Sequence, residues 1–507
     1  MSSKGLVYLV GAGPGDPGLI TVKGLACLQK ADVVIYDRLV SPALLREAPR
    51  GCELIDAGKS PKGHALPQEA INALLVEKAL AGKVVVRLKG GDPFLFGRGG
   101  EEAEALAEAG VPFEVVPGVT SAIAAPAYAG IPVTHRDHTS TFTVVTGHED
   151  PTKADPSIDW QKLATGVGTL VFLMGVGNLP KIVAKLIEHR RDPRTPVAIV
   201  QEGTEAHQKT VSGTLADIVE RAREADIKPP AVTIVGEVVR LREKLRWFDT
   251  KPLFGKRVLV TRSREQASAL SQRLRELGAE PLEYPTIAIA PPKDIAPLDE
   301  AIARLPTYDW LIITSANGVR ALVDRMSEKG MDIQALGRPK IAAIGPATAQ
   351  ALAEYGLRVD YMPQVYLAEQ IAAGIGDVAG QRILLPRAAR VPKQLAQVLR
   401  DKGAVVDEVA AYRTLAVGAP DELKALLADG QIDIVTFTSS STLSNLVAGL
   451  QGLTPADVMS RCLVACIGPV TARTAARLGI RVDVVAKEHT IPGLVEAIVA
   501  ALRQPPE

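Results

Sequence analysis

The chain has 507 residues, a length that corresponds to roughly two to four domains. Charged residues make up 23% of the sequence and hydrophobic residues 47%, which is the balance of an ordinary globular protein. The formal net charge of +1 argues against a general nucleic-acid binder and against a polybasic membrane anchor.

The four cysteines are too few for a disulfide scaffold in a chain of this length. Cys462 and Cys466 lie in or beside an apolar run, so we expect core thiols without a redox or metal role. The N-terminus enters a strand pattern at once, with no signal peptide, and no apolar stretch is long enough for a membrane helix. We therefore expect a cytoplasmic protein with no membrane partner.

The first predicted strand, Leu6–Val10, runs into the glycine turn Gly11–Asp16, and a second strand over Asp32–Asp37 ends in an acid. This order imitates the dinucleotide-binding fingerprint. The fit is imperfect, because Asp16 stands where the third glycine belongs and Pro14 removes a backbone donor from the turn. A nicotinamide-dependent oxidoreductase stays open as an alternative at this point.

The segment Arg87–Gly100 follows an apolar run, Val84–Val86, that indicates a buried strand. It contains five glycines, an aspartate and a proline, a composition that predicts a loop with close backbone approach to a ligand. Glu101 and Glu102 then open a helix with an acidic first turn. Phe113–Ser121 is another strand that ends in a glycine turn, so these loops should converge at one edge of an open sheet.

The segment His135–His138 invites a metal interpretation, but it lacks the glutamate of H-E-x-x-H and precedes a strand, so we predict no metal site. His135 and Arg136 are better suited to contact an acidic substrate. A second α/β unit should follow over residues 140–245, with a domain boundary near residue 252. Its predicted strands are Phe142–Val145, Thr169–Met174, Val197–Val200 and Val232–Val235.

The second half of the sequence contains an internal duplication with an offset of about 124 residues. Each copy places hydroxyl side chains after a strand and contains an Ile-Gly-Pro turn whose following threonine is expected to cap a helix. These Ser and Thr residues could equally be ordinary helix caps. Two similar lobes usually hold a ligand between them. The matching segments are Lys256–Arg262 with Gln381–Arg387, Tyr308–Asn317 with Ile432–Ser441, Ala343–Ala349 with Cys466–Ala472, and Gly356–Asp360 with Gly479–Asp483.

Taken together, the motifs of the first half resemble uroporphyrinogen-III C-methyltransferase over about residues 4–247. The second half resembles uroporphyrinogen-III synthase over about residues 255–502, a match that the duplication and the hydroxyl-bearing loops support. The motifs that carry the first resemblance are Val10–Asp16, Tyr36–Leu39, Arg87–Pro93, Val116–Thr120 and Val200–Thr204.

The resemblance implies an α/β protein with an N-terminal two-domain tetrapyrrole methyltransferase fold and a C-terminal bilobal, flavodoxin-like synthase fold. The methyltransferase would span residues 1–248, with subdomains at about 1–137 and 138–248, and a linker would follow at 249–254. The synthase would span 255–507. One of its lobes would combine about 255–289 with 415–507, and the other would comprise about 290–414.

In the first half, the resemblance implies that S-adenosylmethionine is bound and donates methyl groups. Asp37 matches the family's proton acceptor and Lys59 its proton donor, although Lys59 could also be a solvated surface residue. Arg38, Arg98, His135 and Arg136 are candidate partners for the substrate carboxylates. A homodimer through this half is also implied. The residues that would line the cofactor are Pro14, Gly90, Gly91, Asp92, Leu95, Thr120, Ser121, Met174 and Gly203.

In the second half, the resemblance implies cyclisation of hydroxymethylbilane to uroporphyrinogen III with inversion of ring D. Tyr412 matches a tyrosine suspected of assisting hydroxide departure, although it could instead be a linker aromatic that packs between the lobes. The remaining substrate-binding candidates are Arg262, Ser315, Arg387, Ser439, Ser440 and Thr471.

The two activities would together yield precorrin-2 through methylation at C2 and C7, for sirohaem or cobalamin, without a metal or nucleic acid. One alternative is a methyltransferase whose C-terminal half is a tetrapyrrole-binding or regulatory module.

Overall fold

The structure is a computed structural model that describes residues 5–49, 51–58, 66–147, 158–261, 264–364, 368–389 and 394–503. The predicted site residues Lys59 and Arg262 lie outside these ranges. The chain divides into two compact units, one built from Met1–Val258, Gln272–Pro281 and Val499–Glu507 and the other from Leu259–Ser271 and Leu282–Ile498. Within the described ranges, none of the helices combines the length and apolar character needed to traverse a lipid bilayer.

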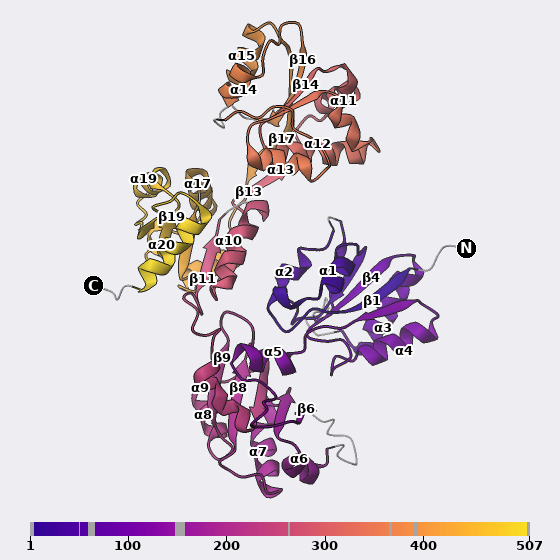
Figure 1. The fold of residues 1–507 in the computed structure, drawn as a ribbon, viewed down its shortest axis with the longest axis vertical. Helices are drawn as coiled ribbons and strands as arrows, with labels where there is room; N and C mark the ends of the chain where they lie inside the picture. The colour runs from indigo at the N-terminus through magenta and orange to yellow at the C-terminus, as the bar shows by residue number, and fades with distance from the viewer. Residues whose placement is uncertain are drawn as a thin grey trace. The chain divides into compact units, whose positions relative to one another are not determined.

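Five parallel strands form the first sheet, in the order β3-β2-β4-β1-β5, and Figure 1 shows β4 beside β1. Apart from the edge strand β3, they are rich in valine, leucine and isoleucine, as expected for parallel strands covered on both faces. This sheet confirms the predicted strands of the first part of the chain. Its members are β1 (Leu6–Gly11), β2 (Val33–Tyr36), β3 (Glu53–Asp56), β4 (Val84–Lys89) and β5 (Phe113–Val116).

Helices cover both faces of the first sheet. α1 (Val22–Leu28) and α2 (Pro42–Leu45) pack on the face that receives Val86 and Leu88 of the central strand β4. α3 (Gln68–Leu80) and α4 (Gly99–Glu108) pack on the opposite face, which receives Val85. Because side chains alternate along a strand, Arg87 and Lys89 share the face of Val85 and point toward α4.

The second sheet is mixed, in the order β6-β7-β10-β8-β9, with β10 antiparallel to both of its neighbours. Helix α5 (Ser121–Tyr128) and the 3-10 helix η3 (Glu237–Leu241) pack on one face, and α6 (Trp160–Gly166), α7 (Leu179–Glu188) and α8 (Ile218–Glu224) pack on the other. The strands are β6 (Phe142–Thr146), β7 (Thr169–Leu173), β8 (Pro196–Gln201), β9 (Lys209–Thr214) and β10 (Ala231–Val235).

All four strands predicted for the second sheet are present, but the sequence did not predict β9. β9 is a partly exposed edge strand whose residues do not alternate between apolar and polar. The charge-rich segment after β10 is neither one helix nor a strand, because η3 passes directly into the short helix α9 (Arg242–Leu245). Short 3-10 helices (η1, Pro17–Leu19; η2, Val176–Asn178) also follow β1 and β7.

The third sheet takes its strands from both ends of the second half, in the order β12-β11-β18-β19-β20. Helices α16 (Asp421–Ala428), α17 (Ser440–Gly449), α18 (Pro455–Met459) and α19 (Pro469–Arg477) contribute to one core beside it. Helices α10 (Arg264–Glu276) and α20 (Ile491–Arg503) complete this part. The strands are β11 (Arg257–Val260), β12 (Glu280–Glu283), β18 (Ile434–Phe437), β19 (Leu463–Cys466) and β20 (Val484–Val485).

The fourth sheet has the order β13-β17-β16-β14-β15. α11 (Ala296–Ala303), α12 (Ala316–Glu328) and α13 (Pro346–Ala353) pack on one face, and α14 (Ala368–Gly374) and α15 (Gln394–Asp401) pack on the other. Along the chain, the 3-10 helix η4 (Leu305–Thr307) connects α11 to β14, and η5 (Ile333–Gly337) connects α12 to β15. The strands are β13 (Ile287–Ala290), β14 (Trp310–Ile313), β15 (Lys340–Ala343), β16 (Arg382–Ala388) and β17 (Val405–Ala416).

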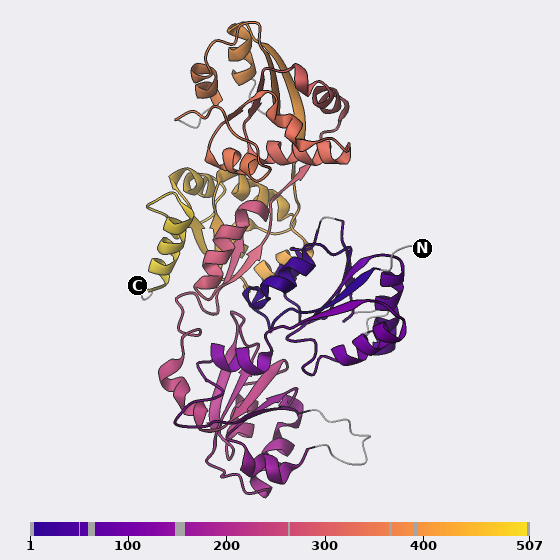
Figure 2. The same ribbon diagram turned by 45° about the vertical axis from the view of Figure 1, so that its right-hand side comes forward.

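The internal duplication predicted from sequence is visible in these two sheets. The neighbours β11-β18-β19 in one sheet correspond to β16-β14-β15 in the other, and both trios carry the matched sequence segments. The chain passes between the sheets in two strands that pair with each other, because β13 runs antiparallel to the end of β17. Figure 2 shows the ribbon of both halves. Together the four sheets confirm the predicted α/β fold class.

One local prediction in the duplicated turns is wrong. Thr348 and Thr471 lie inside α13 and α19, and the cap positions belong to Gly345 and Gly468. The proline after each glycine occupies the first helical turn, where its fixed φ angle and missing N–H are well accommodated. The helix therefore starts before the threonine is reached. Both threonines are buried, at 3% and 4% exposure.

A buried tyrosine makes the fourth sheet sensitive to alkaline pH. Burial, followed by a hydrogen bond of 2.6 Å to Asp407, raises the pKa of Tyr308 to about 12. The folded state keeps this proton above pH 10, where an unfolded tyrosine loses it, so stability falls as the pH rises from 10 toward 12. We expect Tyr308 to account for a loss of about 1.4 kcal/mol by pH 11.

The measurement is a set of urea titrations between pH 9 and 11 on the wild type and on Tyr308→Phe. The difference in unfolding free energy between the two proteins should shrink as the pH rises. A constant difference would contradict the assigned pKa.

Candidate active sites

Three loops meet at the carboxyl edge of the first sheet, as the sequence predicts. Gly13 and Gly91 exchange backbone hydrogen bonds of 3.3 and 2.8 Å, which joins the loop after β1 to the loop after β4. The Asp92 carboxylate accepts hydrogen bonds from the backbone N–H groups of Phe94, Leu95 and Gly118, at 2.8, 3.1 and 2.9 Å. Asp92 therefore ties the loop after β4 to the loop after β5.

Glycine is required where these loops cross. A Cβ atom on Gly11 would lie 2.5 Å from the Gly118 Cα and 2.7 Å from the Gly91 carbonyl oxygen. Gly91 itself has a φ angle of +68° and faces Thr120 at the start of α5. The predicted cofactor-lining residues Gly90, Gly91, Asp92, Leu95, Thr120 and Ser121 lie on the loops after β4 and β5 or at the start of α5, close to this crossing of the backbones.

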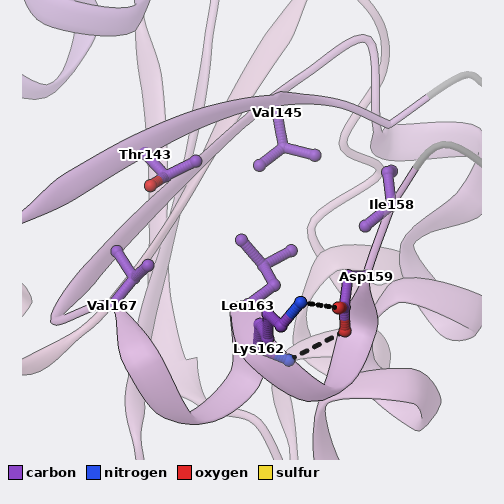
Figure 3. A pocket seen from close by; sticks show the side chains of 7 residues that line it. All are labelled: Thr143, Val145, Ile158, Asp159, Lys162, Leu163 and Val167. Atoms are coloured by element: carbon purple, nitrogen blue, oxygen red, sulfur yellow. Dashed lines mark hydrogen bonds and ion pairs between the residues drawn. The ribbon is translucent and has the colours of Figure 1, made fainter.

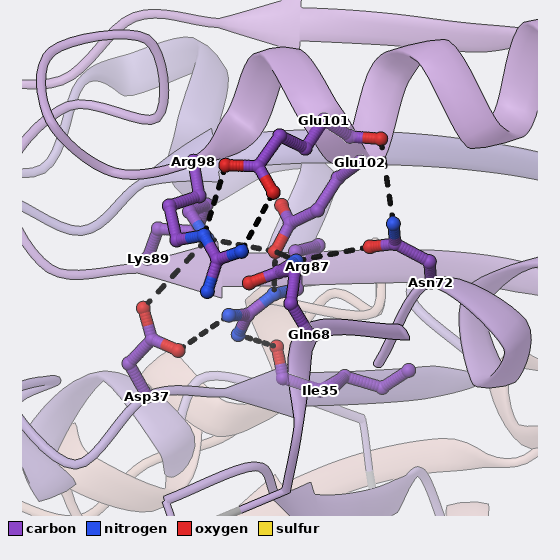
Figure 4. Close-up of polar contacts among 9 residues, drawn as sticks. All are labelled: Ile35, Asp37, Gln68, Asn72, Arg87, Lys89, Arg98, Glu101 and Glu102. Carbon is purple, nitrogen blue, oxygen red and sulfur yellow. Dashed lines mark hydrogen bonds and ion pairs between the residues drawn. The ribbon is translucent and has the colours of Figure 1, made fainter. Parts of the chain in front are cut away.

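The predicted proton acceptor, Asp37, ends β2 beside this surface and takes part in a buried network of charges (Figure 4). Arg87 donates from one nitrogen to Asp37 Oδ1 at 2.5 Å and from its Nε to Glu102 Oε1 at 2.9 Å. Lys89 Nζ lies 2.8 Å from the same Glu102 oxygen and 4.0 Å from Asp37 Oδ2. Burial, and then the neighbouring Arg87, lower the pKa of Lys89.

The loop of the predicted substrate residue Arg98 lies at the rim of the same network. Arg98 forms a two-point ion pair with Glu101, with distances of 2.9 and 2.7 Å, and both side chains are exposed. Phe96 and Arg98 have positive φ angles of 53° and 58°. Such conformations are costly for residues other than glycine and gather at binding sites.

A second set of strained residues lies at the strand ends of the second sheet. Met174, Glu202 and Thr204 have φ angles of 56°, 48° and 79°, and the Met174 side chain is 54% exposed. Gly203 stands between Glu202 and Thr204, where a Cβ would come within 2.4 Å of the Ala125 Cβ on α5. Met174 and Gly203 therefore both occupy constrained positions in loops at the strand ends.

Asp16 joins the first glycine turn to the second sheet. Its backbone N–H donates to Thr204 Oγ1 at 3.0 Å, and its carboxylate accepts from the Tyr128 hydroxyl at 2.7 Å. Burial, followed by the hydrogen bond to Asp16, raises the pKa of Tyr128. The turn that contains Pro14 is thereby held next to the loop that contains Gly203. The sequence drew attention to Asp16 as the residue that spoils a dinucleotide fingerprint and as the end of the motif Val10–Asp16, but it did not predict these contacts.

The other predicted substrate residues of the first half are less closely integrated. Arg38 is exposed directly after Asp37, so it lies at the same strand end. His135 and Arg136 lie in a tight turn closed by hydrogen bonds between His135 and Thr139. The contacts of His135 are local, to Asp137 and to the ring of His138.

In the fourth sheet, Ser315, which follows β14, lies against Tyr412 of β17, and Arg387 of β16 has a different partner. The Tyr412 hydroxyl lies 3.0 Å from Ser315 Oγ, and Ser315 caps α12 by accepting from the Gly318 N–H at 3.0 Å. Tyr412 pairs with Ala388, the residue after Arg387, at an irregularity in the strand register. Arg387 is 7% exposed and donates to Glu408 at 3.0 Å.

The third sheet presents an equivalent group of hydroxyls. Ser439 caps α17 by accepting from the Thr442 N–H at 3.2 Å. The Ser440 hydroxyl connects α17 to α19 through Thr474, at 3.0 Å. Thr471 lies one turn before Thr474 on α19 and is buried. The capping role that the sequence left open is therefore real for Ser315 and Ser439.

A hollow elsewhere in the protein does not coincide with these sites. It lies between β6 and α6 (Figure 3) and is lined by mostly apolar side chains beside an ion pair of 3.0 Å between Asp159 and Lys162. None of the predicted site residues lines it. Within the described ranges, no cluster of His, Cys, Asp and Glu is arranged to hold a metal ion.

The sequence did not single out Arg87, Lys89 or Glu102 as functional residues. A usable signal was present, because two cations stand in an otherwise apolar strand, and Lys and Arg are almost never fully buried unless they are paired. Their exposed fractions are 2% each, and that of Glu102 is 0%.

Two family models match the chain. Residues 6–219 match the Tetrapyrrole (Corrin/Porphyrin) Methylases, and residues 268–496 match Uroporphyrinogen-III synthase HemD. These ranges fall on the two halves that the sequence motifs distinguish.

Some relatives match nearly the whole chain and others match part of it. The porphyrin biosynthesis protein HemD of Ruminiclostridium josui is 42% identical over 498 residues, which cover 97% of each chain. The S-adenosyl-L-methionine-dependent uroporphyrinogen III methyltransferase of Methanosarcina barkeri is 53% identical over 241 residues, 48% of this chain and 94% of the relative. The solved uroporphyrin-III C-methyl transferase from Thermus thermophilus complexed with S-adenyl homocysteine is 43% identical, covers 47% of this chain and 94% of its own, and has a TM-score of 0.40.

The crossing of the glycine loops predicts a steric effect. In Gly118→Ala the new Cβ would stand 2.3 Å from the Gly91 carbonyl oxygen, so we expect a loss of about 1–3 kcal/mol in unfolding free energy. Gly100→Ala is the matched control, because a Cβ there meets nothing within 4 Å and its position is helical. Denaturant titration compares both variants with the wild type. Equal stability of the two variants would show that the loops separate without cost.

Proposed function

The chain belongs to the family of porphyrin biosynthesis proteins that join a tetrapyrrole methylase to a uroporphyrinogen-III synthase, and on this premise we propose that it is a bifunctional enzyme. The C-terminal half cyclises hydroxymethylbilane to uroporphyrinogen III with inversion of ring D. The N-terminal half transfers two methyl groups from S-adenosylmethionine to C2 and C7 of that product, which gives precorrin-2. The observation that carries the proposal is the end-to-end match to one relative combined with a matching site in each half.

S-adenosylmethionine fits the glycine loops of the first half. The close backbone crossing of Gly11, Gly91 and Gly118 leaves a surface of peptide groups, and the exposed Met174 has a strained backbone. The bound sulfonium supplies an activated methyl group, so the protein has chiefly to align the pyrrole carbon with it. The relative from Methanosarcina barkeri, which is named as S-adenosyl-L-methionine-dependent, supports this choice of methyl donor. We propose no metal.

Asp37 accepts the proton that the reaction releases. When the pyrrole carbon attacks, a carbon–carbon bond forms, the sulfur–methyl bond breaks with its electron pair going to sulfur, and positive charge builds on the ring. The cation then loses a proton, which removes the positive charge. Asp37 suits this task because its carboxylate is 34% exposed at the rim of the loops and anchored from below by Arg87. Arg38 and Arg98 are the nearby candidates for substrate carboxylates, and Lys59 remains the proposed proton donor.

In the second half, Tyr412 assists departure of hydroxide from hydroxymethylbilane. Its hydroxyl lies 3.0 Å from the Oγ of Ser315, the residue that caps α12, and this contact favours one orientation of the group. Loss of hydroxide leaves an electrophilic carbon, and ring closure through a spiro intermediate inverts the last ring. The hydroxyls of Ser439 and Ser440 and the buried Arg387 are proposed to hold the substrate, together with Thr471 and Arg262.

We also propose how the activities divide along the chain. The methyltransferase spans residues 1–248, with subdomains at 1–137 and 138–248, a linker covers 249–254, and the synthase covers 255–507. The sheet that combines β11 and β12 with β18, β19 and β20 supports a synthase lobe assembled from about 255–289 and 415–507, with the other lobe at about 290–414. A cytoplasmic homodimer through the first half completes the proposal.

The proposal is tested with the full chain, hydroxymethylbilane and S-adenosylmethionine under anaerobic conditions. Mass spectrometry and isomer analysis should find a type III product with two added methyl groups. A type III product without methyl groups would contradict the methyltransferase, provided that uroporphyrinogen III supplied directly is also left unmethylated. Only the spontaneous type I isomer would contradict the synthase and favour a binding or regulatory role for the second half.

Replacement of the proposed proton acceptor should slow methyl transfer. We expect Asp37→Asn to lower the rate with supplied uroporphyrinogen III by roughly 100-fold, while binding of S-adenosylhomocysteine is retained. Asp32→Asn is the matched control. Asp32 directly precedes β2, at the end of the strand opposite Asp37, and its carboxylate accepts a hydrogen bond from the Val84 N–H at 2.8 Å. An unchanged rate in Asp37→Asn would exclude Asp37 as the acceptor.

Removal of the Tyr412 hydroxyl should impair only the second half. In Tyr412→Phe we expect the yield of type III isomer to fall by roughly 100-fold, with methylation of supplied uroporphyrinogen III unchanged. Tyr308→Phe is the control, since it removes a buried hydroxyl from the same sheet that bonds to Asp407 instead. Similar type III yields from both variants would contradict the role of Tyr412.

A further inference from the structure

Four charged groups converge beneath the carboxyl edge of the first sheet. Arg87 and Lys89 carry two positive charges on the central strand β4, and Glu102 on α4 and Asp37 at the end of β2 carry two negative charges. Three of the four are buried, with exposed fractions of 2% or less, and only Asp37 reaches solvent. The charges therefore balance only if Asp37 contributes to the cluster.

The geometry makes Arg87 a connection between the two carboxylates. Its Nε binds Glu102 Oε1, and a different nitrogen binds Asp37 Oδ1, so the planar guanidinium spans from one acid to the other. The remaining terminal nitrogen donates to the Ile35 carbonyl at 3.3 Å. The Asp37 backbone N–H is bound to the Leu88 carbonyl at 3.2 Å. Backbone and side chain of Asp37 are thus both fixed by β4.

The hydrogen bonds of Glu102 are unevenly distributed. Oε1 accepts hydrogen bonds from the side chains of Arg87, Lys89 and Gln68, at 2.9, 2.8 and 3.2 Å. Oε2 has no hydrogen-bond partner among the described residues. A buried oxygen without a partner is costly. An arrangement selected for stability alone would satisfy both oxygens, and departures from such rules gather at functional sites.

We propose that Glu102 is a positioning residue for methyl transfer, which acts on Asp37 through Arg87. Glu102 holds the guanidinium so that it captures Asp37 Oδ1 and leaves Oδ2 directed at the substrate. Lys89, 4.0 Å from Oδ2, limits the rotation of the carboxylate from the other side. The inference deepens the proposed function of Asp37 and rests on it. Glu102 itself is fully buried and does not touch the substrate.

The test is a double-mutant cycle on the full chain with uroporphyrinogen III and S-adenosylmethionine. We expect Glu102→Gln to lower kcat by about 10- to 100-fold, because a displacement of about 1 Å at a reacting group costs that much. The dissociation constant of S-adenosylhomocysteine, measured by calorimetry, should stay within about twofold, because the glycine loops are untouched. In the Asp37→Asn background, Glu102→Gln should have almost no further effect, since its target is already lost.

Two comparisons protect the test against a merely structural result. Glu104→Gln makes the same chemical change on an exposed position of α4 and should leave kcat unchanged. If Glu102→Gln does not accumulate as folded protein, Arg87→Lys replaces it. That variant keeps the charge balance, but a single ammonium cannot hold both carboxylates through separate nitrogens. It should show the same loss of kcat and the same lack of effect beside Asp37→Asn.

The outcomes separate the inference from the function on which it rests. If Asp37→Asn is slow and Glu102→Gln slows it again by its full factor, the two residues act independently and the inference is overturned, while the role of Asp37 stands. Wild-type kcat in both Glu102→Gln and Arg87→Lys also overturns it. If Asp37→Asn turns over at the wild-type rate, the proposed role of Asp37 fails, and the inference fails with it.

Discussion

Two cations in the middle of a buried strand impose a constraint on the whole first half of the protein. Arg87 and Lys89 stand on β4, with other strands on both sides and helices on both faces, so water cannot solvate them. Their charges have to be met within the core, and α4 supplies Glu102 for this purpose. The glycine loop that links β4 to α4 is consequently anchored at both ends, by hydrogen bonds through Asp92 and by the ion pairs of Glu102.

The two halves build their strand-end sites by different physical means. In the first half, backbones approach so closely at Gly11, Gly91 and Gly118 that side chains are excluded, and peptide groups form the surface. In the second half, Ser315 and Ser439 cap helices after equivalent strands of the duplicated sheets, so hydroxyls form the surface.

Much of the fold follows from local sequence, because apolar runs that end in glycine turns mark parallel strands with little ambiguity. The buried charge network does not follow from local sequence. Arg87 is buried because β4 is the central strand of the sheet, and the order of strands in a sheet is a tertiary property. The sequence explains Glu102 as part of the acidic first turn of a helix, and this explanation gives no sign that its side chain points into the core. Asp16 gains its partner Thr204 from 188 residues away. The cap expected at Thr471 is wrong because Pro469, two residues earlier, already occupies the first turn of α19.

The strand order of the third sheet has a consequence for synthesis on the ribosome. β11 and β12 emerge early, but β18, the strand beside β11, comes much later, and the paired residues Thr261 and Thr436 are 175 positions apart. All strands of the fourth sheet lie between them in one continuous stretch. The lobe that contains the fourth sheet can therefore complete its core before β18 is synthesised and pairs with β11. During that interval β11 exposes an unpaired apolar edge, and such an edge can pair with another chain. The risk of aggregation of the nascent second half therefore lasts until β18 has been synthesised.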